Sequence, residues 1–190
     1  MTLHTARAGI PSSAERIVRG FAIALGGSLL LAVSAKVQVP FYPVPMTLQT
    51  LVVLLLGAGL GARLAAASVA LYLIEGLAGL PVFASAVAGP LYMAGPTGGF
   101  LVGFLAAAAL IGFAADRFWD RSWIRLLVSL SIGHAVIFAF GFVWLAQLIG
   151  GEKAFAAGVA PFALATILKT LLAVALVGAW RRAFRRTIRA

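Results

Sequence analysis

The sequence predicts an all-α integral membrane protein, a bundle of six transmembrane helices with both termini in the cytoplasm. Apolar residues make up 63% of the 190-residue chain and charged residues only 11%, and the mean hydropathy is +1.07. A soluble protein carries about 25% charged residues and cannot bury this much apolar surface. The apolar residues also form six separate runs, most of them near the roughly 20 helical residues that cross a bilayer core about 30 Å thick.

The first three runs cover residues 20–39, 46–60 and 62–80. Three prolines in the segment 40–45 separate the first run from the second, because proline cannot lie inside a regular helix. The second run is short and ends at the glycines around Gly61. We expect the third run to end at Pro81.

The last three runs cover residues 98–115, 124–149 and 161–180. A loop rich in proline and glycine, residues 81–97, precedes them. A charged segment from Asp116 to Arg125 separates the fourth run from the fifth, and residues 150–153 break the chain after the fifth. Pro161 opens the sixth run at a position that proline favours, the first turn of a helix.

The basic residues predict the orientation, because cytoplasmic loops carry an excess of lysine and arginine. With the N-terminus inside, all twelve arginines fall on the cytoplasmic side, and Lys153 is the basic residue of the outer loops. They are Arg7, Arg16, Arg19, Arg63, Arg117, Arg121, Arg125, Arg181, Arg182, Arg185, Arg186 and Arg189. We therefore interpret the net charge of +10 as a mark of orientation and not of nucleic-acid binding. The predicted parts are a polar N-terminal segment 1–15, a transmembrane domain 16–182 and a basic tail 183–190.

Four polar residues lie where the surrounding sequence is apolar, and such residues are candidates for function. Lys169 lies about eight residues into the sixth run with no carboxylate within a turn. We interpret it as a cation for an anionic ligand group; the alternative is a lysine that snorkels to the surface. Lys36, near an outer helix end, is expected to snorkel. Glu75 is expected to form an ion pair with Lys36 or Lys169, or to cap loop backbone, and Gln49 to bond loop backbone or a ligand amide.

These four residues share the outer half of the predicted bundle with the loops 40–45 and 81–97. Non-helical backbone at membrane depth is tolerated where it lines a cavity or is buried in protein. The sequence therefore predicts a pocket that opens to the outside, with a cation at its wall. His134, in the middle of the fifth run, predicts a helix-to-helix hydrogen bond or a role toward a ligand or proton.

Several chemistries lack their residues in this sequence. The chain has no cysteine, only five carboxylates, and two histidines 130 positions apart. It lacks a phosphate-binding loop, a serine nucleophile elbow and a zinc-protease motif. We expect no catalytic residue, no metal and no bound cofactor, and an ATP-driven step would need a partner protein.

Small residues at Ala24, Ser28 and Ala32 repeat every four positions on the first run, beside the pair Ala22 and Gly26. Such stripes let another helix approach closely. Packing within the bundle and docking to another membrane subunit are both open.

Two long motifs resemble the loops of the BioY family. They are the segment Val39–Thr50, with Leu60-Gly61-Ala62-Arg63 downstream, and the pair Gly79–Phe83 and Gly95–Phe104. Pro161-Phe162 with Lys169 is similar to the last-helix motif of that family. The resemblance covers roughly residues 20–180.

The resemblance implies a six-helix biotin-binding S-component of an energy-coupling-factor (ECF) transporter in the bacterial inner membrane. Such subunits work with a transmembrane coupling subunit and two ATPases, so ATP would act only through partners, and no nucleic acid is involved. The small-residue face of the first helix would dock on the coupling subunit. Lys169 would hold the biotin carboxylate, and Gln49, Tyr42, Tyr92 and the backbone of 83–97 would surround its rings.

The chain departs from the family pattern at two positions. Thr166 stands where the family usually has an aspartate, three residues before Lys169, and Val87 falls where some members have a ligand-binding asparagine. A different vitamin or small carboxylate is therefore an alternative ligand. More remote alternatives are a ligand-free assembly subunit and a membrane enzyme that uses Asp116 and Asp120. Because arginines flank these two aspartates, we expect them to lie in a solvated, salt-bridged turn instead.

Overall fold

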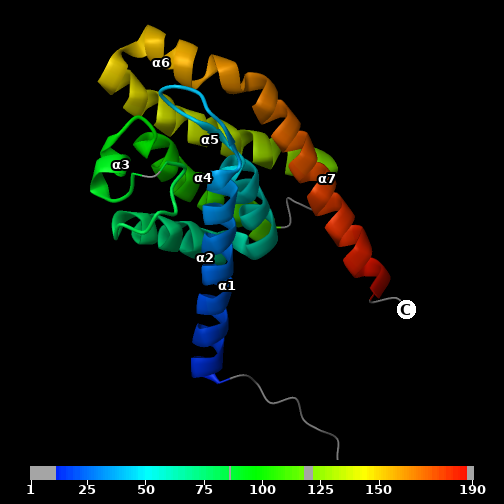
Figure 1. Ribbon diagram of the computed structural model, residues 1–190. Coiled ribbons are helices and arrows are strands. Elements are labelled where there is room, and N and C mark those ends of the chain that lie inside the picture. The colour runs from blue at the N-terminus through cyan, green and yellow to red at the C-terminus, as the bar shows by residue number, and fades with distance from the viewer. Residues whose placement is uncertain (1–11, 86, 118–121, 188–190) are drawn as a thin grey trace, which may run out of the picture.

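The computed structural model describes residues 12–85, 87–117 and 122–187 (Figure 1). Most of the predicted N-terminal segment, Asp120, Arg121 and Arg189 lie outside the described residues. The elements are α1 (Ser13–Lys36), β1 (Gln38–Val39), β2 (Met46–Thr47), α2 (Gln49–Leu77), α3 (Pro90–Ala94), α4 (Gly98–Asp116), α5 (Trp123–Ile149), α6 (Gly151–Gly158), the 3-10 turn Ala160–Phe162, and α7 (Ala163–Thr187). The predicted all-helical class is confirmed.

The described residues form five helical stretches that are long and apolar enough to cross a membrane. One of them, α2, contains a non-helical residue, Gly61, with φ 76° and ψ 173°. A positive φ is accessible to glycine because it has no Cβ. The chain reverses there, so α2 is two helices, and the long helices of the described residues number six, which agrees with the six apolar runs.

The reversal at Gly61 is capped by Asp116, the last residue of α4. Its Oδ2 atom accepts a hydrogen bond of 3.1 Å from the Ala62 backbone N–H, at the start of the second half of α2. A carboxylate at a helix N-terminus accepts a hydrogen bond from an otherwise unpaired backbone N–H, and its negative charge interacts favourably with the positive end of the helix dipole. Asp116 is exposed, as expected for a solvated turn, and it has a structural role as well.

The structure shows several elements that the sequence patterns did not predict. α1 begins seven residues before the first predicted run, because Ser12 and Glu15 form a capping box. Gly150, with φ 85°, ends α5 and turns the chain directly into α6, where a break was expected. The proline segment after α1 forms a small antiparallel hairpin in which Gln38 pairs with Thr47.

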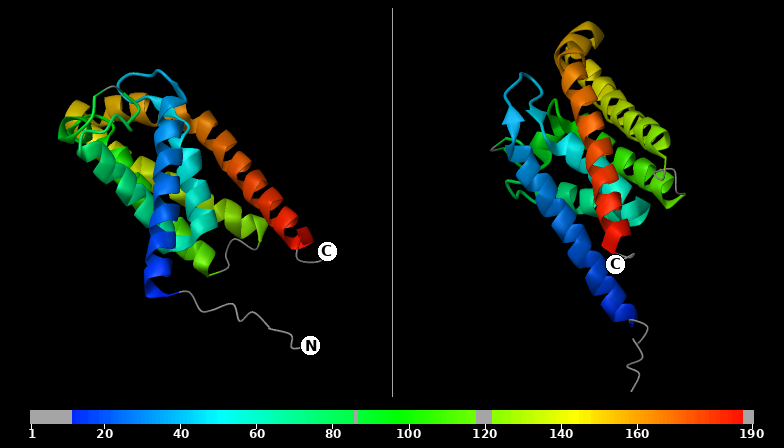
Figure 2. Two further views of the ribbon diagram at one scale, coloured as in Figure 1. Left: turned by 60° about the horizontal axis from the view of Figure 1, so that its bottom comes forward. Right: turned by 90° about the vertical axis from the view of Figure 1, so that its right-hand side faces the viewer.

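The core lies where α2, α4 and α5 cross, and α1 and α7 flank it (Figures 1 and 2). Among the five stretches, α4 is the most buried and the one that contains α7 the least. At Gly112 of α4 an added Cβ would lie 2.5 Å from the Gly61 carbonyl carbon, so only glycine allows this approach.

The two ends of the molecule differ. The hairpin, the described residues of the segment 78–97, and α6 gather at one end, which we call the loop end (Figure 2, left). The first turn of α1 and the last turn of α7 lie at the opposite end. This arrangement follows from six helices that alternate in direction.

The stripe of small residues on α1 faces α2. Ala24 and Ser28 are buried, Ala32 is half-buried, and the Ser28 hydroxyl donates a hydrogen bond to Glu75 of α2. Ala24 and Ser28 therefore pack within the bundle, and the prediction that they lie on a partner-docking face is wrong. Small side chains serve a close approach to any helix, so the pattern itself does not name the neighbour.

Candidate functional site

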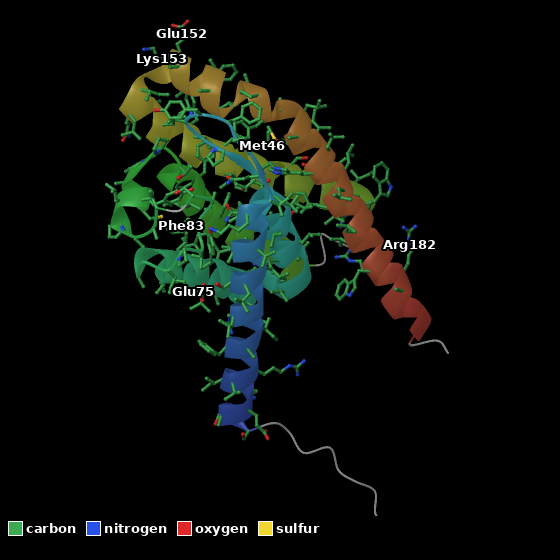
Figure 3. All side chains as sticks on the ribbon, in the orientation of Figure 1. Met46, Glu75, Phe83, Glu152, Lys153 and Arg182 are labelled. Atoms are coloured by element: carbon green, nitrogen blue, oxygen red, sulfur yellow. The ribbon has the colours of Figure 1, made fainter. Side chains whose placement is uncertain are left out.

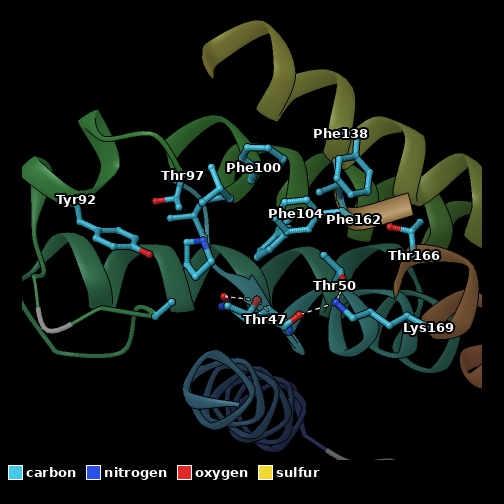
Figure 4. A pocket seen from close by; sticks show the side chains of 16 residues that line it. Thr47, Thr50, Tyr92, Thr97, Phe100, Phe104, Phe138, Phe162, Thr166 and Lys169 are labelled. Carbon is cyan, nitrogen blue, oxygen red and sulfur yellow. Dashed lines mark hydrogen bonds between the residues drawn. The ribbon is translucent and has the colours of Figure 1, made fainter. Parts of the chain in front are cut away.

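A pocket lies at the loop end, between the hairpin, the first turn of α2, α4, α5 and the start of α7 (Figure 4). Its walls are largely apolar, with a few hydroxyl groups and one cation. It is lined by Val44, Pro45, Thr47, Gln49, Thr50, Ala84, Tyr92, Thr97, Phe100, Leu101, Phe104, Ile137, Phe138, Phe162, Thr166 and Lys169. A concave apolar site with few polar groups is the usual form of a small-molecule pocket.

Lys169 supplies the positive charge of the pocket. It reaches from α7 toward the start of α2, where its Nζ donates to the Thr47 carbonyl at 2.6 Å and to Thr50 Oγ1 at 3.2 Å (Figure 4). An ammonium group has three donors, so one remains for a ligand. In the described part of the chain no carboxylate forms an ion pair with Lys169, and the charge is not neutralised.

Gln49 begins α2 and is buried. Its Nε2 donates to the Tyr72 hydroxyl at 2.6 Å, and its Oε1 accepts from Thr47 Oγ1 at 3.2 Å. Tyr72 in turn donates to the Val82 carbonyl at 3.3 Å. The chain of bonds joins the hairpin, α2 and the segment 78–97, so Gln49 lines the pocket mainly as a support for its wall.

Replacing Tyr72 with phenylalanine should therefore loosen this wall. The change leaves the buried Gln49 amide without its acceptor, which costs about 1–3 kcal/mol. We expect the free energy of unfolding to fall by about that amount, measured by thermal or denaturant unfolding in detergent. An exposed control is Tyr42→Phe, which should change nothing; equal stability of Tyr72→Phe would show that the bond chain is not stabilising.

Hydroxyl groups of Tyr92 and Thr97 line the pocket away from Lys169 (Figure 4). The Tyr92 ring stacks on Phe83 with centroids 4.7 Å apart, and Phe83 and Tyr72 make an edge-to-face contact with centroids 5.5 Å apart. Burial raises the pKa of the Tyr92 phenol, against a lowering by the Thr97 hydroxyl. The phenol therefore stays protonated and can donate a hydrogen bond.

Aromatic side chains form the walls between these polar groups. Phe138 of α5 meets Phe100 edge-on at 6.1 Å and Phe162 at 6.0 Å, and Phe162 lies 6.1 Å from Phe41 of the hairpin. Rings in such tilted and edge-to-face contacts hold one another in place. The result is a fixed apolar slot with a cation on one wall and hydroxyls on another.

Four predicted ligand residues line the pocket: Lys169, Thr166, Gln49 and Tyr92. The other three predicted ligand residues do not line it, and their predicted place is wrong: Tyr42, Val87 and Glu75 (Glu75 is labelled in Figure 3). Tyr42 is 95% exposed because it lies at the tip of the proline-rich hairpin. Val87 is half exposed and bonds Ser85 through its own backbone.

Glu75 lies on α2 facing α1, where it accepts from Ser28. Among the described residues it has no ion pair with Lys36 or Lys169, so the expected pair is wrong. Lys36 instead donates to the Phe83 carbonyl at 2.6 Å, and Gln38 to the Ala84 carbonyl at 3.1 Å. These two bonds tie the hairpin side to the segment 78–97.

Several pocket residues were not predicted, notably Thr50, Thr97 and the phenylalanines. Thr50 follows Gln49 by one residue and belongs to the motif at the start of α2, which could have indicated it. No sequence pattern distinguishes the pocket phenylalanines from the many other apolar residues of this chain. In the described residues no cluster of three or more His, Cys, Asp or Glu could hold a metal ion.

Comparisons with known proteins cover three quarters of this chain or more. A family model described as the BioY family matches residues 5–186. A probable biotin transporter BioY of Pyrococcus horikoshii is 40% identical over 145 residues, 76% of this chain and 85% of that protein. The biotin transporter BioY of Thermotoga maritima is 37% identical over 145 residues, again 76% of this chain and 85% of that protein. The crystal structure of an S-component for biotin from an ECF-type ABC transporter matches with TM-score 0.78 at 23% identity, over 90% of this chain and 95% of that one.

Proposed function

Because this chain belongs to the BioY family, we propose that it captures biotin at the outer face of a membrane for uptake into the cell. It is a multi-pass membrane protein of a transporter family and not an enzyme. The observation that carries the assignment is the pocket itself, in which one unneutralised lysine faces an aromatic slot with hydroxyls on another wall.

Biotin has groups that suit each part of this pocket. Its carboxylate would accept a charge-assisted hydrogen bond from the Lys169 Nζ donor that the Thr47 and Thr50 contacts leave free. Its sulfur-containing ring would pack between Phe104, Phe138 and their neighbours. Its ureido group both donates and accepts hydrogen bonds, which the Tyr92 and Thr97 hydroxyls can return. The pocket thus binds the two ends of the ligand through different chemistry.

The two departures from the family pattern bear on this ligand. Thr166 lines the pocket and offers one hydroxyl where the family has a carboxylate. Val87 lies outside, and Ala84 and Tyr92 line that side of the pocket. These substitutions support one second candidate, a different small carboxylate with a less polar ring system.

The direction of capture follows from the basic residues. The loop end carries Lys153, whereas Arg16 and Arg19 lie in the first turns of α1 at the opposite end. By the positive-inside rule the pocket faces outward and both termini are cytoplasmic, in the bacterial inner membrane. No cofactor is bound in this role.

Release into the cell requires energy that this sequence has no motif to supply. We propose that a transmembrane coupling subunit and ATPase subunits of an ECF transporter provide it. The exposed small residues of α1, Ala22 and Gly26, allow a close helix contact with that coupling subunit. The loops 40–45 and 81–97 would close over the bound ligand.

Equilibrium binding of labelled biotin to the detergent-purified full chain tests the function. We expect tight binding, with biotin methyl ester competing at least tenfold more weakly because it lacks the charge that Lys169 binds. A panel of other small vitamin carboxylates tests the second candidate. Absence of biotin binding, with one of these competitors bound instead, would move the assignment to that ligand.

A further inference from the structure

His134 lies in the middle of α5, is 2% exposed and faces α7. Its Nδ1 atom is 2.8 Å from Thr170 Oγ1, so the predicted helix-to-helix hydrogen bond is present. Thr170 follows Lys169 directly in the chain. The bond therefore joins α5 to α7 one residue beyond the cation of the pocket.

The direction of this bond can be assigned from its neighbours. The Thr170 hydroxyl has one hydrogen, and it donates that hydrogen to the Thr166 carbonyl at 2.8 Å. The bond to His134 must then be donated by Nδ1–H, which fixes the ring in the Nδ1-protonated tautomer. His134 Nε2 is buried and has no partner in the described structure.

On α7 the side chains next to Lys169 largely face away from the bundle, whereas Thr170 and Ala173 face it and are buried. Its residues beside Lys169 are widely exposed, including Ile167 at 57% and Leu168 at 58%. These apolar side chains gain little by contacting protein instead of lipid, because the two are equally apolar. They therefore give α7 little preference for one position. The His134–Thr170 bond, with no water in hydrocarbon to compete for it, supplies such a preference.

Ligand binding makes this bond more important. Lys169 itself joins α7 to the start of α2 through Thr47 and Thr50. A carboxylate on the remaining Nζ donor also competes with Thr47 and Thr50 for the ammonium group and so weakens that link. The His134–Thr170 bond is independent of the ligand and keeps Thr166 and Lys169 at the pocket wall.

We propose that His134 is a positioning residue for the anionic end of the ligand. It acts through Thr170, whose place on α7 sets where Lys169 Nζ meets the carboxylate. His134 also lies one helical turn from Phe138, with ring centroids 6.5 Å apart, so the same residue supports the aromatic wall. This inference rests on the proposed biotin function.

The test compares the affinities of purified variants for biotin and for its uncharged methyl ester. In His134→Leu and in Thr170→Val we expect biotin affinity to fall by about three- to tenfold, the range of an interhelical hydrogen bond in a membrane. Ester affinity should stay near that of the wild type. His134→Asn, which can place an amide N–H near the Nδ1 position, should restore most of the loss, as should Thr170→Ser.

A double variant, His134→Leu with Thr170→Val, should lose no more than either single variant, because both remove the same bond. Equal losses for biotin and ester would show that His134 only stabilises the fold and would overturn the proposal. Unchanged biotin affinity in both single variants would also overturn it. If Lys169→Ala fails to alter the preference for biotin over the ester, the carboxylate assignment itself fails, and the two failures are thereby distinguished.

Discussion

Replacing Lys169 with alanine should weaken biotin binding by about 100-fold, the upper range for a hydrogen bond to a charged group in a half-buried site. The ammonium group is the pocket's one positive charge within the described residues, and it already lies between Thr47, Thr50 and the cavity. Without it the carboxylate would enter an aromatic slot with no counter-charge, which is costly in a low-dielectric setting. Equilibrium binding of labelled biotin to purified protein measures the effect.

The methyl ester separates this cause from a general loss of structure. Wild-type protein should prefer biotin to its ester, and Lys169→Ala should bind the two with similar affinity. Lys153→Ala, an exposed lysine of α6 at the same end of the molecule, is the matched control and should behave as wild type. Retention of the full preference for biotin in Lys169→Ala would place the carboxylate elsewhere in the pocket.

Replacing Gly99 with valine should disrupt both the fold and the pocket. A Cβ at Gly99 would lie 2.6 Å from the Phe140 carbonyl oxygen of α5 and would also collide with Trp144. Backbone cannot move aside as a flexible side chain can, so α4 must shift away from α5. Phe100 and Leu101, the next residues of α4, line the pocket and would shift with it. We expect a loss of about 3 kcal/mol in the free energy of unfolding, the upper range for overpacking.

Thermal unfolding in detergent and biotin binding together measure this effect. Gly178→Val is the control, because an added Cβ at that α7 glycine meets nothing within 4 Å. The control should unfold near the wild-type temperature and bind biotin normally. Equal behaviour of Gly99→Val and Gly178→Val would mean that the close approach of α4 and α5 is not required.

The pocket shows where sequence reasoning succeeded and where it stopped. Lys169 was identifiable because a charge inside an apolar run has a large cost in hydrocarbon and needs a reason. Glu75 met the same criterion, but its partner proved to be Ser28 of α1. Depth along a helix can be counted from the sequence, whereas the side of the helix that faces the pocket depends on packing.

The same distinction holds for the fold. Hydropathy, prolines and glycines determined the membrane class, the six helices and the end at which the loops gather, because transfer into a bilayer is governed by composition over each run. The small-residue stripe of α1 and the phenylalanines could not be assigned in this way. Lipid and protein interior are both apolar, so no pattern tells which neighbour a helix face meets. Only the tertiary structure placed Ala24 against α2 and exposed Tyr42 to solvent. It also brought Thr50, Thr97 and four phenylalanines into the pocket that Lys169 lines.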